Sequence, residues 1–379
     1  MIDIKQLIDT DDLATFDPYD IWKSKLGYGV KALFNFNKYL GLIPAATLTI
    51  FDDLNDSSRI GYKKQEYPIV RAFAALTALR CYQNSKVNDW LIIAKRHLDW
   101  LMTNKAEFSE HYSWGINFKL SIKKDLVYPA NVGFTTITPY ALEAFDIYYQ
   151  ITQDESILPV FQGVYEFLEN DIQIMYEDDL SMATSYGPSN DRIVTNSASY
   201  TMYSYAILSK YINNKEEINS KINKLYKFIS KHQNEDGSWL YEPLSNNSFV
   251  DCFHSCFVLK NIIKTNTIIS LEQSDNLIYK GIAYLKNNFF DSETGLYKRF
   301  SLSNKPSFIK WDLYDNAEML NVLNLTNDIK SARSLNASIE KHFISRSRIY
   351  SQINYFNKKR KKDTLRWAVM PYIYALTYL

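Results

Sequence analysis

The sequence predicts an all-α protein whose helices pair into two concentric rings, an (α/α)6 toroid. Three observations lead to this prediction. Apolar residues recur at helical spacing along almost the whole chain, while alternating β-branched runs are scarce. Two kinds of helix alternate, and equivalent points in the chain recur at a nearly regular interval.

Helices of the first kind are rich in small and aromatic residues, and we expect them to be buried on all sides. They are predicted over residues 68–82, 139–151, 197–211, 251–263, 313–323 and 366–378. Helices of the second kind have one apolar stripe and a charged face, which is typical of helices that cover a surface. They are predicted over residues 88–102, 156–170, 216–231, 274–287 and 327–343.

The spacing of the buried helices indicates a repeated helical hairpin. Equivalent positions near their starts lie 69, 59, 55, 62 and 53 residues apart, at Ala72, Ala141, Tyr200, Ser255, Ala317 and Met370. Each interval holds two helices and a loop. Six buried and five covering helices leave one outer partner missing. A helix over 21–40 could supply it by closing the ring against the last helix, so that 1–379 form a single domain. An open superhelical array is the alternative.

Long loops precede the buried helices, at 112–138, 176–196, 240–250 and 296–311. Loops of this length in a compact domain are commonly functional. In a ring they would gather at one end, where the inner helices present their N-termini and favour anionic groups. We therefore expect the functional site at that end.

Composition excludes several classes of function. Lys and Arg (43) nearly balance Asp and Glu (42), so no global field attracts nucleic acid or an acidic membrane. We do not expect the acidic N-terminal segment to act as a signal peptide, and no apolar run is long enough to span a membrane. Cys81, Cys252 and Cys256 have no framework spacing, which favours a reduced, cytoplasmic compartment. Nothing in the sequence calls for a metal or a cofactor.

The stretch QNEDGSW at 233–239 is the most recognisable motif. Gly237 permits a left-handed turn after a helix, Trp239 can fold back on that helix, and Gln233 can bond the next repeat. The motif resembles the QW repeat of squalene and oxidosqualene cyclases and of prenyltransferase subunits, where it is structural. A terpenoid cyclase-like enzyme is therefore one alternative, although the DxDD acid motif of those cyclases is absent. Asp251, Cys252 and His254 are poorly spaced for zinc.

An ordered set of motifs gives a closer resemblance: DPYD at 17–20, WGINF at 114–118, SYGPSNDRIVTN at 185–196, QNEDGSW, and DCFHS at 251–255. Together they resemble uncharacterised α/α-toroid proteins encoded in bacterial capsule and O-antigen loci. The resemblance implies the toroid fold and a role in surface polysaccharide biosynthesis, with a glycan or sugar nucleotide as substrate and polysaccharide-assembly proteins as further partners. Lys119, Leu120 and Cys256 depart from the pattern.

Candidate site residues fall at the predicted open end of the ring. The candidates for proton transfer are His254, Asp251, Tyr186, Asp191 and Asp312. The candidates for substrate binding are Trp114, Asn117, Trp311, Asp315, Arg366 and Trp367. Arg366 would hold a substrate carboxylate in a bidentate pair, and the Trp rings would stack on sugars. Each has a structural alternative: Asp251, Asp312 or Asp315 could only cap a helix, and His254 could be a core imidazole.

Three functions remain open from these residues. In a glycoside hydrolase, two carboxylates flank the glycosidic bond. In a lyase or C5-epimerase, a Tyr or His removes the proton next to a uronate carboxylate, and an Arg stabilises the resulting anion. A toroid that only binds a glycan or a partner protein is the third. The basic run KKRKK at 358–362 is expected to be a solvated loop, with a polyanion or membrane contact as the alternative.

Overall fold

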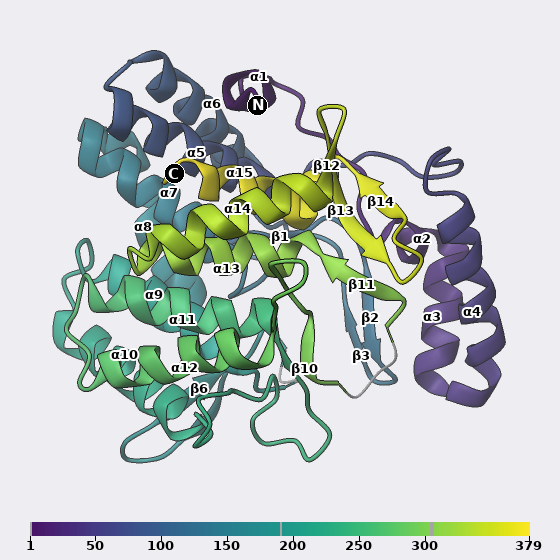
Figure 1. Cartoon of the computed structure of the whole chain (residues 1–379). Coiled ribbons are helices and arrows are strands. Elements are labelled where there is room, and N and C mark those ends of the chain that lie inside the picture. The colour runs from purple at the N-terminus through teal and green to yellow at the C-terminus, as the bar shows by residue number, and fades with distance from the viewer. Residues whose placement is uncertain (1, 190–191, 304–306) are drawn as a thin grey trace.

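The computed structural model describes residues 2–189, 192–303 and 307–379, and these form the predicted α/α toroid (Figure 1). The described inner ring consists of α5 (Pro68–Ser85), α7 (Thr138–Thr152), α9 (Thr195–Leu208), α11 (Cys252–Asn266), α13 (Leu313–Leu325) and α15 (Met370–Leu376). The described outer helices are α6 (Asp89–Thr103), α8 (Leu158–Glu166), α10 (Lys215–Lys231), α12 (Ser274–Asn288) and α14 (Ile329–Phe343).

The two kinds of helix occupy the two rings, as their composition predicts. All fourteen residues of α9 are buried, because neighbours contact it on every side. The outer helix α10 instead buries one stripe that includes Ile218, Ile222, Leu225 and Ile229. Each inner helix packs against the next, and α15 packs back on α5 to close the ring.

The segment 21–40 does not take the missing outer position, and this corrects the predicted helix. It is divided among α2 (Asp20–Lys23), α3 (Lys25–Phe36) and the start of α4 (Lys38–Leu54). Asn37 ends α3 and caps α4 by accepting from the backbone N–H groups of Tyr39 and Leu40. The α3–α4 hairpin lies at the edge of the molecule, apart from α15 (Figure 1). The single-domain organisation stays a prediction.

The long connections carry short antiparallel strands that periodicity did not predict. The described pairs are β1 (Gly115–Ile116) with β4 (Val132–Gly133), β2 (Leu120–Lys123) with β3 (Leu126–Tyr128), β5 (Ile174–Glu177) with β6 (Met182–Thr184), β7 (Val250–Asp251) with β10 (Phe300–Leu302), and β8 (Phe290–Asp291) with β9 (Leu296–Tyr297). A further sheet joins β11 (Ile309–Asp312), β13 (Arg348–Asn354), β12 (Ile344–Ser345) and β14 (Lys359–Lys362). Except for β13, which has seven residues, these strands have two to four residues and are too short for an alternating pattern to stand out.

The motif QNEDGSW forms the predicted structural latch. Gly237 has φ +94°, and Trp239 donates from its indole to the carbonyl of Ile229 at 3.1 Å. Gln233 donates to the carbonyl of Leu277 in the next hairpin at 3.0 Å. Asp236 accepts from the N–H of Ser238, as a turn residue does. The motif therefore ties α10 to α12 and belongs to the fold.

Two further predictions concern the cysteines and the membrane-spanning potential of the helices. Cys252 and Cys256 are buried, with free thiols, and Cys81 is also free. Within the described part of the chain, no helix combines the length and the apolar character needed to cross a membrane.

Candidate functional site

The inner-helix N-termini and the strand-bearing connections meet at one end of the ring, which we call the mouth. An aromatic cluster lies there, formed by Tyr19, Phe253, Tyr314 and Trp367. The rings of Tyr314 and Trp367 are 4.6 Å apart between centroids, and those of Phe253 and Tyr314 are 5.3 Å apart. Tyr19 contacts the edge of Trp367 at 5.9 Å. Residues from the N-terminal segment, α11, α13 and the last connection are thereby brought together.

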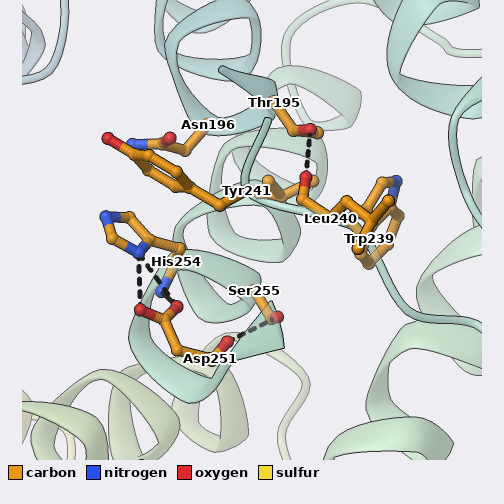
Figure 2. A pocket seen from close by; sticks show the side chains of 9 residues that line it. Thr195, Asn196, Trp239, Leu240, Tyr241, Asp251, His254 and Ser255 are labelled. Carbon is orange, nitrogen blue, oxygen red and sulfur yellow. Dashed lines mark hydrogen bonds and ion pairs between the residues drawn. The ribbon is translucent and has the colours of Figure 1, made fainter. Parts of the chain in front are cut away.

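His254 and Asp251 form a hydrogen-bonded pair at the start of α11 (Figure 2). The Nδ1 atom of His254 lies 2.8 and 2.9 Å from the two carboxylate oxygens of Asp251. The same carboxylate caps the helix by accepting from the His254 backbone N–H at 3.1 Å. Capping and pairing therefore coexist. The carboxylate holds the proton on Nδ1, so that Nε2 carries the free lone pair of the neutral ring.

The Nε2 side of His254 faces a small pocket, away from Asp251 (Figure 2). None of the described residues hydrogen-bonds Nε2. The pocket is narrow: its volume is about 10 Å³, roughly the space that one water molecule needs. Its lining includes Asn196, Tyr241 and Ser255. The ring of Tyr241 packs on His254 with centroids 4.4 Å apart. Asn196 is only 2% exposed, and its Oδ1 has no hydrogen-bond partner among the described residues. A ligand hydroxyl or N–H would supply one.

Three arginines from three different connections surround the mouth. The guanidinium of Arg192 lies 4.9 Å from the ring of Tyr186 and 5.6 Å from that of Tyr241. Arg299 stacks on Phe253 at 5.2 Å and pairs with Asp312 at 3.1 Å.

Arg366 forms a bidentate pair with Asp17, from Nη2 at 2.8 Å and from Nε. Burial opposes the charge on Asp17, yet the Arg366 guanidinium holds the pKa of that carboxyl below its ordinary value. The prediction that Arg366 receives a substrate carboxylate therefore meets a protein carboxylate already in that position.

Asp312 and Asp315 are fully buried behind the aromatic cluster. Asp312 caps α13 and accepts from the Trp367 indole at 3.1 Å. Burial raises its pKa, and Arg299 opposes that shift. Asp315 accepts from the backbone N–H of Phe253. Burial raises its pKa well above the ordinary range, the like charges of Asp312 and Asp251 add to that shift, and Arg299 opposes it. Both acids thus support the wall of the site from within the protein.

Other predicted residues lie apart from the pocket. Trp114 is fully buried, stacks on Phe145 and donates to the Leu101 carbonyl, so its ring is not a platform for a sugar. Asn117 donates to the carbonyl of Glu66, and Trp311 is buried in β11.

Tyr186 does lie at the mouth, and Asp191 lies outside the described residues. Among those that are described, no group of three His, Cys, Asp or Glu side chains is arranged to hold a metal ion.

Sequence reasoning missed Asn196, Tyr241, Arg192 and Arg299 as site residues. Arg192 and Asn196 belong to SYGPSNDRIVTN, in which only Tyr186 and Asp191 were predicted as site residues. Tyr241 follows the latch by two positions. Arg299 follows by the same distance the similar sequence DSETGLY at 291–297, in which Tyr297 stands in place of the tryptophan. A search for polar residues just beyond each latch turn would have found the last two.

The fold is shared with known proteins, although no family model and no curated protein matches the chain. A solved sugar epimerase from a ruminal bacterium superposes with a TM-score of 0.61 at 14% identity, covering 84% of this chain and 88% of that one. A cellobiose 2-epimerase from Bacillus thermoamylovorans gives 0.64 at 11% identity, covering 83% and 86%. A polysaccharide lyase gives 0.55 at 10% identity, covering 94% and 97%. The chain therefore has the α/α-toroid fold that these proteins share.

Proposed function

We propose that this protein is a carbohydrate-active enzyme in which His254 and Asp251 move a proton at a sugar carbon next to a carbonyl or carboxylate. The single observation that carries the proposal is the environment of His254. Its Nδ1 is fixed by a buried carboxylate, while its Nε2 faces a pocket. This is the arrangement that a general base needs. The solved proteins that share this fold include a sugar epimerase, a cellobiose 2-epimerase and a polysaccharide lyase, which supports a sugar substrate.

The acids at the mouth favour proton abstraction over glycoside hydrolysis. A hydrolase needs two carboxyl groups that reach opposite sides of a glycosidic bond. Asp251 holds His254, and Asp312 is engaged by Arg299 and Trp367. Asp315 is fully buried. A lyase or epimerase needs one base and one cation that stabilises the developing oxyanion. His254 is the candidate base and Arg192 the candidate cation, and both lie beside the ring of Tyr241.

The lone pair of Nε2 takes the proton from the sugar carbon, and the C–H electrons form the carbon–carbon double bond of an enolate. Asp251 stabilises the imidazolium that results, and Arg192 stabilises the enolate oxygen. Return of a proton to the opposite face completes an epimerisation, for which Tyr186 beside Arg192 is the candidate donor. Loss of a substituent from the neighbouring carbon completes a lyase reaction instead.

The ordered sequence motifs support a narrower setting for this enzyme. We place it in the cytoplasm, in bacterial capsule or O-antigen biosynthesis, with a uronate-containing glycan or a sugar nucleotide as substrate and polysaccharide-assembly proteins as partners. This setting rests on the sequence resemblance and on nothing in the pocket.

Isotope exchange tests the proposed step directly. Reducing disaccharides and uronate oligosaccharides are incubated with the protein in D₂O, and deuterium at the carbon next to the carbonyl or carboxylate is followed by NMR. His254→Ala should lower exchange by at least about a hundredfold, because general-base catalysis contributes about 10²–10⁴. His232→Asn is the matched control, since this histidine follows an outer helix and, among the described residues, its ring is hydrogen-bonded to the Phe228 carbonyl alone. Full exchange by His254→Ala would refute the assignment.

A binding toroid without catalysis is the second candidate, and one observation favours it. Asp312 and Arg366, two of the charged groups expected to meet substrate, are already paired with protein groups. If this reading holds, calorimetry will detect glycan binding that Asn196→Ala weakens, while no exchange occurs with any substrate tested.

A further inference from the structure

The α3–α4 hairpin exposes an unusually large apolar surface, which we call the hairpin face. One side of α4 carries exposed apolar residues at helical spacing: Tyr39, Ile43, Ile50 and Leu54. Of these, Tyr39 is 92% exposed, Ile43 75% and Leu54 76%. Further exposed apolar side chains on the hairpin are Leu26, Leu33, Phe36, Leu40, Leu42 and Phe51. Scattered exposed apolar residues are ordinary, but a contiguous face of this extent marks a contact surface.

The hairpin is built as a rigid unit, so its exposed face is not the side of a loose segment. Gly41 allows close contact between its helices, because a Cβ there would lie 2.2 Å from the Cα of Phe34. At its base, the ammonium of Lys361 lies 2.8 Å from the Asp52 carboxylate, and Arg360 pairs with Asp53 at 2.8 Å. The run KKRKK was expected to be a solvated loop, but most of it forms β14, and its Arg360 and Lys361 hold the hairpin.

Away from its base, where Asp52 and Asp53 pair with Lys361 and Arg360, the hairpin face is surrounded mostly by lysines. Residues 24–51 contain Lys25, Lys31 and Lys38 and neither Asp nor Glu. The neighbouring β2–β3 turn adds Lys119, Lys123 and Lys124, with Asp125 as its single acid. Lys124 lies 5.1 Å from the ring of Phe36 and Lys119 lies 4.8 Å from that of Tyr28, so these ammonium groups belong to the rim of the face.

An apolar face with a basic rim matches the interface of an anionic bilayer. Apolar side chains enter the boundary between headgroups and acyl chains, and each lysine near the surface gains attraction from anionic lipid. A partner protein or a second copy of the chain would need acidic groups opposite these lysines. A second copy of the same face would instead bring like charges together.

We propose that the hairpin face docks this protein on an anionic phospholipid bilayer, with α3 and α4 lying in the plane of the interface. The docking is independent of the reaction proposed for His254. It is also reversible, because one amphipathic hairpin buries far less apolar area than a spanning helix.

Vesicle co-sedimentation of the full chain tests this docking. Vesicles of phosphatidylcholine with phosphatidylglycerol are compared with vesicles of phosphatidylcholine alone. The wild-type protein should sediment with the anionic vesicles and be released at high salt, where the screening length falls from about 10 Å to about 3 Å. Ile43→Ser/Ile50→Ser and, separately, Lys38→Glu/Lys124→Glu should each lower the partition coefficient by at least about tenfold.

Matched controls change the same chemistry elsewhere on the surface. Leu180→Ser/Tyr279→Ser alters two equally exposed apolar residues, and Lys215→Glu/Lys280→Glu alters two exposed lysines; both should bind as wild type. Thermal unfolding verifies that each variant is folded. If the isoleucine variant is not folded, vesicle binding by the lysine variant decides whether the hairpin face docks on the bilayer. The proposal is overturned if wild type stays in the supernatant, or if both hairpin variants bind normally. A dimer that the isoleucine variant dissociates, without vesicle binding, overturns it in favour of a second copy.

Discussion

The pair between Asp17 and Arg366 should be among the most stabilising contacts of the mouth, and Asp17→Ala measures it. Asp17 is fully buried and also accepts from the backbone N–H of Tyr19 at 2.8 Å, while 13% of the Arg366 side chain is exposed. Removal of the carboxylate leaves an almost buried guanidinium without its partner, which costs about 3–5 kcal/mol. That is a large share of a typical unfolding free energy of about 5–15 kcal/mol.

Urea unfolding followed by circular dichroism gives the magnitude, and a double-mutant cycle gives the cause. Arg366→Met alone should also destabilise, because it leaves the Asp17 carboxylate buried and unpaired. The double variant should cost less than the sum of the two single changes, by about 1–3 kcal/mol. A cost below about 1 kcal/mol for Asp17→Ala, or strict additivity, would refute the account of a desolvated charge pair.

The pH dependence of this effect has a defined sign. The pKa of Asp17 is lowered in the folded protein, so its contribution is present above its unfolded value of about 3.9 and is lost as pH falls through the lower folded value. The difference between wild type and Asp17→Ala should therefore be constant near neutral pH and shrink in acid.

Three further predictions concern other residues. Asp251→Asn should change the unfolding free energy by less than about 0.5 kcal/mol, because Asn is an equally good N-cap. It should lower exchange activity by about 10²–10⁴-fold, because an amide does not stabilise the imidazolium of His254. If the unfolding free energy and the activation free energy of exchange change by equal amounts instead, Asp251 is only a cap. His97 is buried, donates from Nε2 to the Ile8 carbonyl and accepts from Arg71 at Nδ1, and burial, with Arg71 and Arg96 adding to it, lowers its pKa to about 4. Acidification from about pH 6.5 to pH 4 should then remove about 3 kcal/mol of stability from wild type and much less from His97→Gln, as urea titrations at each pH will report. Trp239→Ala should lower the unfolding free energy by about 3–5 kcal/mol, because the ring is buried between α10 and α12. A loss below about 1 kcal/mol would mean that the latch contributes little to stability.

The parts of the molecule that the sequence predicted are those in which local pattern and final environment agree. The burial of α9 on every side follows from its small and aromatic residues, and the latch at Trp239 follows from a glycine turn beside a helix. The cap at Asp251 was also visible, since an acid three residues before a helical N–H is a local signal. The break at Asn37 was a signal of the same kind, an amide cap inside an apolar run, and it was overlooked.

The rest depended on contacts between distant segments. Trp114 was expected at the surface because it lies in a loop, but the loop folds over its own ring. Nothing near Arg366 in the sequence indicates that Asp17 occupies its guanidinium. The balance of charges over the whole chain likewise concealed the local excess of lysines in residues 24–51, which contain neither Asp nor Glu. Such pairings are set by ring closure, which periodicity alone does not describe.

The closure of the ring determines when the mouth can form during synthesis of the chain. Asp17 and Arg366 are 349 positions apart, and α15 must return to α5 before they can meet. During synthesis, the early hairpins can pack as they emerge, but the mouth cannot form until the last helix has been released. A chain that stops short of α15 will therefore expose the inner faces of α5 and α13 and lack the aromatic cluster, which makes it a target for chaperones and proteases. Completion of the site and completion of the polypeptide are a single event.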